Sequence, residues 1–115
     1  MHELSVTQNI VEIVNRHAEQ AGASRVARIH LVIGDLSSIV DDSVQFYFDY
    51  LSEGTLCAGA TLVFRRVDVK LECGNCGESW QPEGADWRCP ACGVAQAQVT
   101  EGREFFVDSI EVEDS

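Results

Sequence analysis

Cys73-Gly74-Asn75-Cys76 and Cys89-Pro90-Ala91-Cys92 form a pair of C-x₂-C motifs, with the twelve residues 77–88 between them. Two such motifs at this spacing are typical of a structural zinc site, in which four thiolates surround the ion tetrahedrally. Glycines beside the cysteines favour tight turns, because an amide with no Cβ nearby can approach a sulfur closely. The sequence therefore predicts a zinc ribbon with a short hairpin between Glu78 and Trp87. The predicted zinc ligands are Cys73, Cys76, Cys89 and Cys92.

Other uses of four cysteines remain to be weighed against zinc. A rubredoxin-like iron site takes the same four sulfurs, so an iron electron carrier is one alternative. Two disulfides are disfavoured, because the start Met-His-Glu has neither the charged nor the apolar region of a secretory signal and cytosolic thiols stay reduced. We therefore expect a cytoplasmic protein with thiolate ligands. Four thiolates leave no open position for water, which favours a structural zinc over a catalytic one.

The composition limits the partners. The 115 residues suit one compact domain with a small satellite, and 19 Asp+Glu against 8 Lys+Arg give a formal charge of −11. A nucleic-acid-binding protein needs a basic surface, so we expect no nucleic-acid partner. No apolar run reaches the length of a membrane span, so we expect no membrane partner either.

Hydrophobic periodicity predicts two helices and three strands around the ribbon. Apolar residues at three-to-four spacing predict a first helix over 4–21 that ends at Gly22, and a second over 42–52. Alternation predicts strands over 25–33, 60–71 and 104–112. The order favours an α+β fold, in which a three-stranded sheet with two helices carries an inserted Cys₄ zinc-ribbon module. The predicted organisation is an α/β domain that begins over 1–70, the ribbon over 71–98, and a return strand over 99–115 that completes the α/β domain.

The chain start carries a second set of metal donors. Because His2 is bulky, we expect Met1 to be retained with a free amine. That amine, the His2 amide nitrogen and the His2 imidazole can close two small chelate rings around one ion. The Glu3 amide nitrogen, its carboxylate, or an acid from elsewhere could supply a fourth donor. Such nitrogen-rich square-planar sets suit Ni(II) or Cu(II), although so short a motif also arises by chance at a plain surface terminus.

Several stretches together resemble the HypA/HybF family. They are Met1-His2-Glu3, Gly22-Ala23-Ser24-Arg25-Val26, Val32-Ile33-Gly34-Asp35-Leu36-Ser37, Phe46-Tyr47-Phe48-Asp49, Gly54-Thr55, Gly59-Ala60, the two C-x₂-C motifs, and the segment 104–111. The resemblance covers essentially the whole chain. It implies a nickel metallochaperone that helps to insert Ni(II) into [NiFe] hydrogenase, with some relatives also serving urease.

The resemblance also implies roles and partners. His2, with backbone nitrogens and Glu3 as a further candidate, would be the nickel site, and the four cysteines would hold structural zinc. A HypB-type GTPase and the hydrogenase large subunit, or its maturation complex, would be the partners. GTP hydrolysis would belong to the partner, because this chain has no G-x-x-x-x-G-K-[ST] motif.

Two departures from the family pattern bear on the metal sites. Many members carry an acid where this chain has Val40, so Asp41 or Asp42 would have to supply a carboxylate to nickel. Some relatives place a histidine beside a zinc knuckle, whereas Gly77 and Gly93 stand there in this chain. We therefore expect a metal-delivery protein, not an enzyme, whose zinc ligation involves no histidine. The alternatives are a zinc-ribbon adaptor without nickel and the iron electron carrier.

Overall fold

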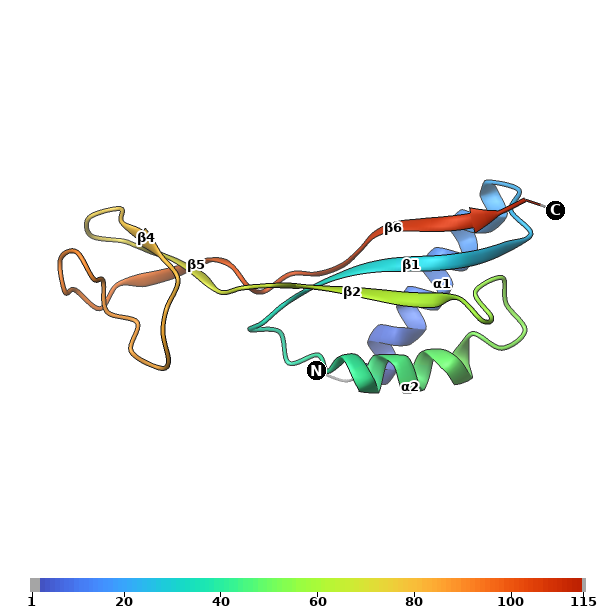
Figure 1. The fold of residues 1–115 in the computed structure, drawn as a ribbon, viewed down its shortest axis with the longest axis horizontal. Helices are drawn as coiled ribbons and strands as arrows, with labels where there is room; N and C mark the ends of the chain where they lie inside the picture. Colours follow the sequence, from blue (N-terminus) through green and yellow to red (C-terminus); the bar gives the residue numbers. More distant parts are fainter. Residues whose placement is uncertain (1–2, 115) are drawn as a thin grey trace. The chain divides into compact units, whose positions relative to one another are not determined.

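The structure, a computed structural model, describes residues 3–114. In this range the chain forms two helices and six strands (Figure 1). Their bounds are α1 (Glu3–Gln20), β1 (Arg25–Gly34), α2 (Asp41–Leu51), β2 (Thr61–Val67), β3 (Lys70–Cys73), β4 (Ser79–Trp80), β5 (Ala97–Glu101) and β6 (Phe105–Glu113). The predicted α+β class, with two helices and an additional four-cysteine module, is confirmed.

The larger sheet has the strand order β2-β1-β6, so β1 lies in the centre and β6, the last strand of the chain, pairs beside it. The Ser24 amide donates to the Glu113 carbonyl at 2.8 Å, and the Gly34 amide donates to the Glu104 carbonyl at 2.7 Å. The beginning of β1 therefore meets the end of β6, and these two strands are antiparallel.

Both helices contribute to one apolar core with this sheet. Helix α1 packs against α2, and Figure 1 shows α1 crossing behind the strands. Of the apolar residues whose spacing predicted α1, Ile10, Val11, Val14 and Ala18 are buried, whereas Leu4 is 42% exposed and Ala21 is also exposed. Leu4 lies beside α2 side chains that are themselves exposed, so no side chain among residues 3–114 buries it there. The most deeply buried core side chains are Val14, Ala18, Val26, Ile29, Leu31, Ile33, Val44 and Phe48.

The strand predicted over 60–71 is wrong as a single element. The chain leaves the first sheet after Val67 and enters a second sheet at Lys70. In that second sheet, of order β4-β3-β5, β3 pairs with both neighbours in antiparallel fashion. The alternation of apolar residues continues across the break, and this is why the sequence alone predicted one strand.

The hairpin predicted within 78–87 is also wrong. Only Ser79–Trp80 forms a strand there, and β4 pairs backward with β3 across the first knuckle. Residues 81–96 contain no strand. Pro82, which has no amide proton to donate, follows β4 closely and is poorly suited to extend it. The ribbon is completed instead by β5, which pairs with the other side of β3 after the second knuckle.

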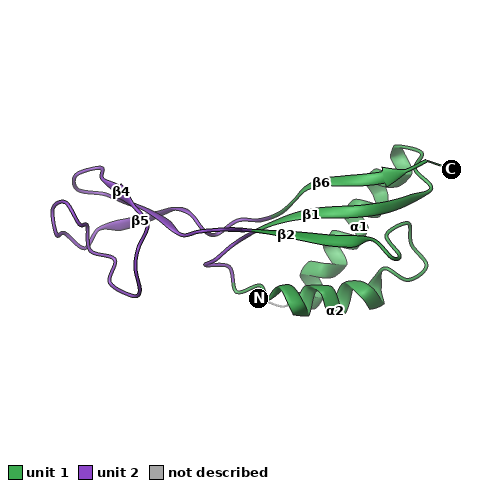
Figure 2. Cartoon of the chain, in the orientation of Figure 1, with its two compact units in different colours: residues 1–32, 38–65, 106–115 green, residues 33–37, 66–105 purple. Residues whose placement is uncertain are grey.

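The chain divides into two compact units (Figure 2). The first comprises residues 1–32, 38–65 and 106–115, and it contains both helices. The second comprises residues 33–37 and 66–105, and it contains the four motif cysteines. Neither α1 nor α2 has the length and apolar character needed to cross a membrane, in the part of the chain that the structure describes.

Within the second unit, the chain at Gly34 lies directly against the chain at Gly102. A Cβ added to Gly34 would lie 2.1 Å from both the carbonyl carbon and the carbonyl oxygen of Gly102, and 2.6 Å from the Arg103 nitrogen. All three are backbone atoms, which cannot turn aside as a side chain can. The Leu36 amide donates to the Gly102 carbonyl at 2.7 Å and holds this approach closed. Residue 34 therefore has to be glycine for steric reasons.

We expect Gly34→Ala to lower the midpoint of thermal unfolding by on the order of 10 °C, because overpacking against fixed atoms costs about 3 kcal/mol. Gly84→Ala is the matched control, since a Cβ there meets nothing within 4 Å and only its φ of 71° is unfavourable. Calorimetry of both zinc-loaded variants checks this. A smaller loss for Gly34→Ala than for Gly84→Ala would contradict the steric argument.

Candidate metal centre

The two knuckles hold their first cysteines by the same backbone pattern. Cys73 ends β3, and its carbonyl accepts the Gly77 amide at 2.9 Å. Cys89 repeats this, with its carbonyl accepting the Gly93 amide at 2.8 Å. Both glycines have positive φ, of 80° and 75°, which turns the chain back after the second cysteine of each motif. The sequence-predicted knuckles are therefore present as two equivalent turns.

Backbone amides surround the sulfur of the first cysteine in each knuckle. The amides of Asn75 and Cys76 point to the Cys73 Sγ at 3.4 and 3.5 Å. In the second knuckle the amides two and three residues after Cys89 point to its Sγ at the same two distances. Such donors stabilise a thiolate, because a sulfur that carries negative charge accepts hydrogen bonds more strongly.

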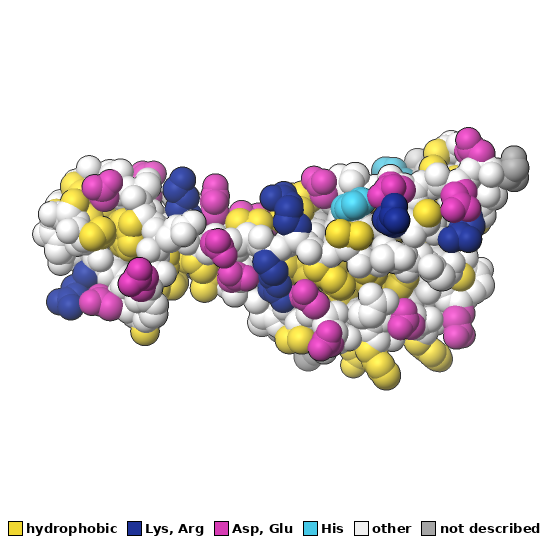
Figure 3. Space-filling view, viewed as in Figure 1, with side chains coloured by type: hydrophobic (Ala, Val, Ile, Leu, Met, Phe, Trp, Pro, Cys, Tyr) yellow, Lys and Arg dark blue, Asp and Glu magenta, His cyan; other side chains and the backbone are white. Residues whose placement is uncertain are grey.

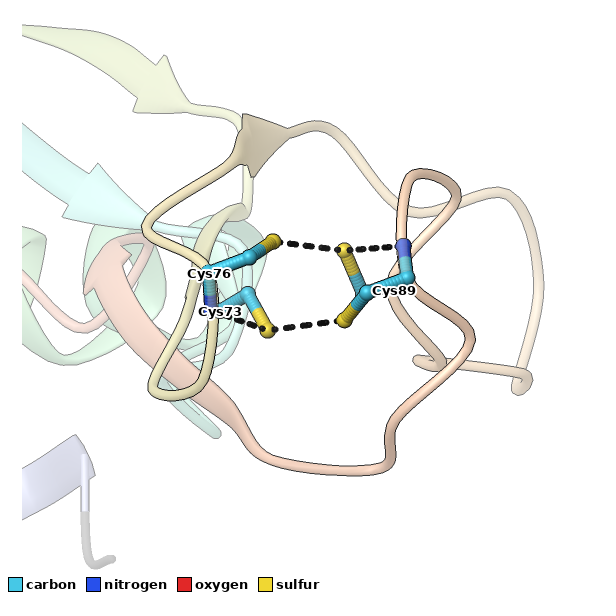
Figure 4. A group of neighbouring side chains, drawn as sticks. Cys73, Cys76 and Cys89 are labelled. Carbon is cyan, nitrogen blue, oxygen red and sulfur yellow. Dashed lines mark hydrogen bonds between the residues drawn. The ribbon is translucent and has the colours of Figure 1, made fainter.

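The structure brings all four predicted cysteines together. Their Sγ atoms all lie within 4.8 Å of one another. The Sγ of Cys73 is 3.7 Å from that of Cys92, and the Sγ of Cys76 is 3.6 Å from that of Cys89. Figure 4 shows Cys73 and Cys76 facing Cys89 across the cluster. Zn–S bonds of about 2.3 Å in a tetrahedron place sulfurs roughly 3.8 Å apart, whereas a disulfide requires about 2.05 Å. The spacing fits a tetrahedral ion and excludes a disulfide in this arrangement.

The pKa values of the cysteine thiols also bear on whether the cluster can hold a cation. The Val94 amide and then the Asn75 side chain lower the pKa of Cys92. Burial raises the pKa of Cys89, but hydrogen bonds from the Cys92 and Ala91 amides outweigh it, and the net shift is downward. The Glu78 amide lowers the pKa of Cys76, yet hydrogen bonds to the other sulfurs raise it to about 12. A bound cation would displace the proton shared by Cys76 and its neighbours, because metal ligation requires the thiolate form.

Asn75 is a member of this site that the sequence analysis did not single out. Its Nδ2 lies 3.7 Å from the Cys92 Sγ, so a side chain of one knuckle reaches a ligand of the other. The signal was available, since a polar side chain between the two cysteines of a knuckle can turn only toward the cluster or toward solvent. An ion held by all four sulfurs would have no free position for a reacting molecule.

The other predicted metal residues lie at the chain start. Met1 and His2 are outside the described residues. Glu3 begins α1, and its Oε2 accepts the Val40 amide at 3.3 Å. Val40 directly precedes α2, whose first turn carries Asp41 and Asp42. The structure therefore brings the starts of the two helices together, and with them three acidic residues, Glu3, Asp41 and Asp42.

The other two histidines and the fifth cysteine lie outside the four-cysteine cluster. His17 is exposed on α1. The His30 Nε2 lies 2.7 Å from Glu111 Oε2, a contact that is the main cause of the lowered pKa of Glu111. This contact joins β1 to β6 and gives His30 a structural role. Cys57 is fully buried with its Sγ 3.9 Å from the Val11 carbonyl, and burial raises its pKa, so it packs as a small hydrophobic side chain.

Comparison of this sequence with known proteins identifies the same family in each case. The family described as "Hydrogenase/urease nickel incorporation, metallochaperone, hypA" matches residues 1–112. A hydrogenase maturation factor HypA from Caldanaerobacter subterraneus subsp. tengcongensis is 41% identical over 114 residues, which cover 98% of this chain and all of the relative. Another from Dehalococcoides mccartyi is 44% identical over 115 residues, covering 99% of this chain and 96% of the relative.

Two solved structures agree with the sequence comparison. The solution structure of the Ni metallochaperone HypA from Helicobacter pylori has a TM-score of 0.70 and 26% identity, and each chain is covered completely. A second solution structure, of a HypA protein, has a TM-score of 0.79 and 26% identity, covering all of this chain and 98% of the other. The predicted resemblance is confirmed across the chain's full length. This chain, with its four-cysteine metal site, belongs to the HypA family of metallochaperones for nickel incorporation in hydrogenase maturation.

Proposed function

We propose that this protein binds Ni(II) at its N-terminus and delivers it for the maturation of [NiFe] hydrogenase, acting as a carrier and not as an enzyme. The observation that carries the proposal is the family match over residues 1–112, which includes the Met-His-Glu start. Urease is a second candidate recipient, because the family description names it beside hydrogenase. The nickel ion is cargo, so its site has to release the ion as well as bind it.

The proposed nickel donors are the Met1 amine, the His2 amide nitrogen and the His2 imidazole. A fourth donor comes from Glu3, or from Asp41 or Asp42 at the start of α2. The hydrogen bond from the Val40 amide to Glu3 supports this choice, since it keeps these acids near the first residues of α1. Nitrogen donors in a square plane suit Ni(II) better than zinc. A site made at a chain terminus also loses its ion more readily than a closed cage.

The proposed zinc ligands are Cys73, Cys76, Cys89 and Cys92, whose spacing fits the ion. Zinc bound there would fix the ribbon's conformation, and the nickel site would remain a separate set of donors. This division matches the chemistry, because thiolates hold zinc tightly while imidazole and amide nitrogens suit nickel.

A HypB-type GTPase and the hydrogenase large subunit, or its maturation complex, are the proposed partners. The chain's formal charge of −11 supports the expectation of no nucleic-acid partner. A cytoplasmic location fits the need to keep four thiols reduced for the metal.

The test is a titration of Ni(II) into untagged, zinc-loaded protein with its native start, followed by calorimetry and by d–d absorption. We expect one nickel per chain, with zinc retained throughout. Protein that binds no nickel would overturn the proposal and leave a zinc-ribbon adaptor. Purified protein with bound iron and a strong visible absorption band would instead favour the electron-carrier alternative.

A further inference from the structure

Helix α2 exposes two aromatic side chains on the side away from the core. Phe46 is 71% exposed and Tyr50 is 72% exposed, and residues four apart lie on the same side of a helix. Val44 and Phe48, on the opposite side, are buried almost completely. Leu4, in the first turn of α1, adds a third exposed apolar side chain. We call Leu4, Phe46 and Tyr50 the aromatic face.

The aromatic face borders a shallow hollow with a preformed wall. The hollow has a volume of about 690 Å³, and its other lining residues are Tyr47, Asp49 and Glu53. The Phe46 ring meets the Tyr47 ring edge to face, with centroids 5.4 Å apart and planes at 76°. This contact restrains the Phe46 ring before anything binds. Aromatic rings left in water around a concavity are typical of protein interaction sites.

The surroundings of the aromatic face are acidic. Between Leu31 and Phe64 the sequence has five Asp or Glu residues and no Lys, Arg or His. Asp49 accepts a hydrogen bond from the neutral Gln45 side chain at 2.8 Å, and across residues 3–114 neither Asp49 nor Glu53 forms an ion pair. Figure 3 shows hydrophobic and acidic side chains, without basic ones, along the lower edge where Figure 1 places α2.

We propose that the aromatic face is a docking site for a basic segment of a partner protein. The segment inserts a bulky apolar side chain beside Phe46 and Tyr50, and its Lys or Arg residues meet Asp49 and Glu53. Such a segment binds as an amphipathic helix or strand, with apolar side chains at the centre of the contact and charged pairs around its rim. The proposal concerns this surface only, and it holds whether or not the chain carries nickel.

The charges decide against two other occupants. A second copy of the chain would bring the same acids against Asp49 and Glu53, and like charges across an interface oppose association. The cytoplasmic face of a membrane carries anionic lipids, which repel an acidic surface. A basic protein segment is the occupant that gains from both the apolar and the charged parts of this surface.

The probe is a fluorescein-labelled peptide of about 16 residues, built from Lys and Leu with the leucines at helical spacing. A scrambled peptide of equal composition controls for charge alone. We expect the patterned peptide to bind zinc-loaded protein saturably, with NMR shift changes centred on residues 45–53. Phe46→Ala combined with Tyr50→Ala should weaken binding at least tenfold. Asp49→Asn combined with Glu53→Gln should weaken it and reduce its dependence on salt.

Phe106→Ala is the matched control, because Phe106 is 46% exposed on β6, outside the aromatic face, and should leave peptide affinity unchanged. Zinc content and thermal unfolding of each variant confirm that it is folded. Absence of saturable binding, or equal affinity of the native protein and the Phe46 and Tyr50 double variant, would overturn the proposal. So would a dimer, or attachment to anionic phosphatidylglycerol vesicles, that the same double variant abolishes.

Discussion

Replacing His2 with alanine should reduce nickel affinity by at least about a hundredfold while zinc content and the fold stay unchanged. Replacing a residue that only supports a metal's direct ligands already lowers metal affinity by up to about a hundredfold. His2 is proposed as a direct ligand, so its loss should cost at least as much. The four cysteines belong to the second unit, whereas Glu3, Asp41 and Asp42 belong to the first, so the two metals should respond separately. The measurement is calorimetric nickel titration of zinc-loaded protein, with zinc determined by elemental analysis.

His17→Ala is the control, since His17 is an exposed histidine on α1 and is proposed for no metal. An extension of two residues before Met1 tests the amine donor, and it should weaken nickel binding while leaving His2 in place. Protons compete for both the imidazole and the amine, so nickel affinity should fall as pH is lowered from about 8 to 6. Unchanged affinity in His2→Ala would show that nickel binds elsewhere.

The sequence predicted those elements whose signals are local. Helix α1, strand β1 and helix α2 begin and end within one residue of the predicted bounds, because periodicity and the flanking glycines mark them. The four cysteines were equally predictable, since each knuckle is closed by hydrogen bonds within its own few residues. Both features need no knowledge of distant parts of the chain.

The two wrong strand predictions share one physical cause. Which strands pair with one another depends on residues far apart in the sequence, and local patterns do not contain that information. The alternation of Val67, Val69, Leu71 and Cys73 runs across the break, but β2 belongs to one sheet and β3 to another. The hydrogen bond from Val40 to Glu3 joins residues 37 apart in sequence, and no motif indicates it. By contrast, the division of α2 is local, because helical spacing places Val44 and Phe48 on the core side and leaves Phe46 and Tyr50 outside it.

Loss of zinc should unfold the ribbon and leave the helical unit folded. Between residues 66 and 105 the buried hydrophobic side chains are Leu71, Cys73 and Cys89. Two of these three are proposed zinc ligands, so the segment has almost no apolar core of its own. Domains of about 40 residues or fewer usually need a metal or disulfides, and zinc supplies on the order of 10 kcal/mol in comparable peptides. Cys89→Ser should therefore abolish zinc binding and the β3–β5 pairing.

The chain offers a separate spectroscopic signal for each unit. Its two tryptophans, Trp80 and Trp87, both lie in the second unit, whereas both helices lie in the first. In Cys89→Ser, or after chelation of zinc, tryptophan emission should shift to the red while helical circular dichroism at 222 nm is largely retained. Cys57→Ala is the matched control, because Cys57 is a buried thiol of the first unit outside the cluster. Native tryptophan emission in zinc-free Cys89→Ser would show that the ribbon folds without its metal.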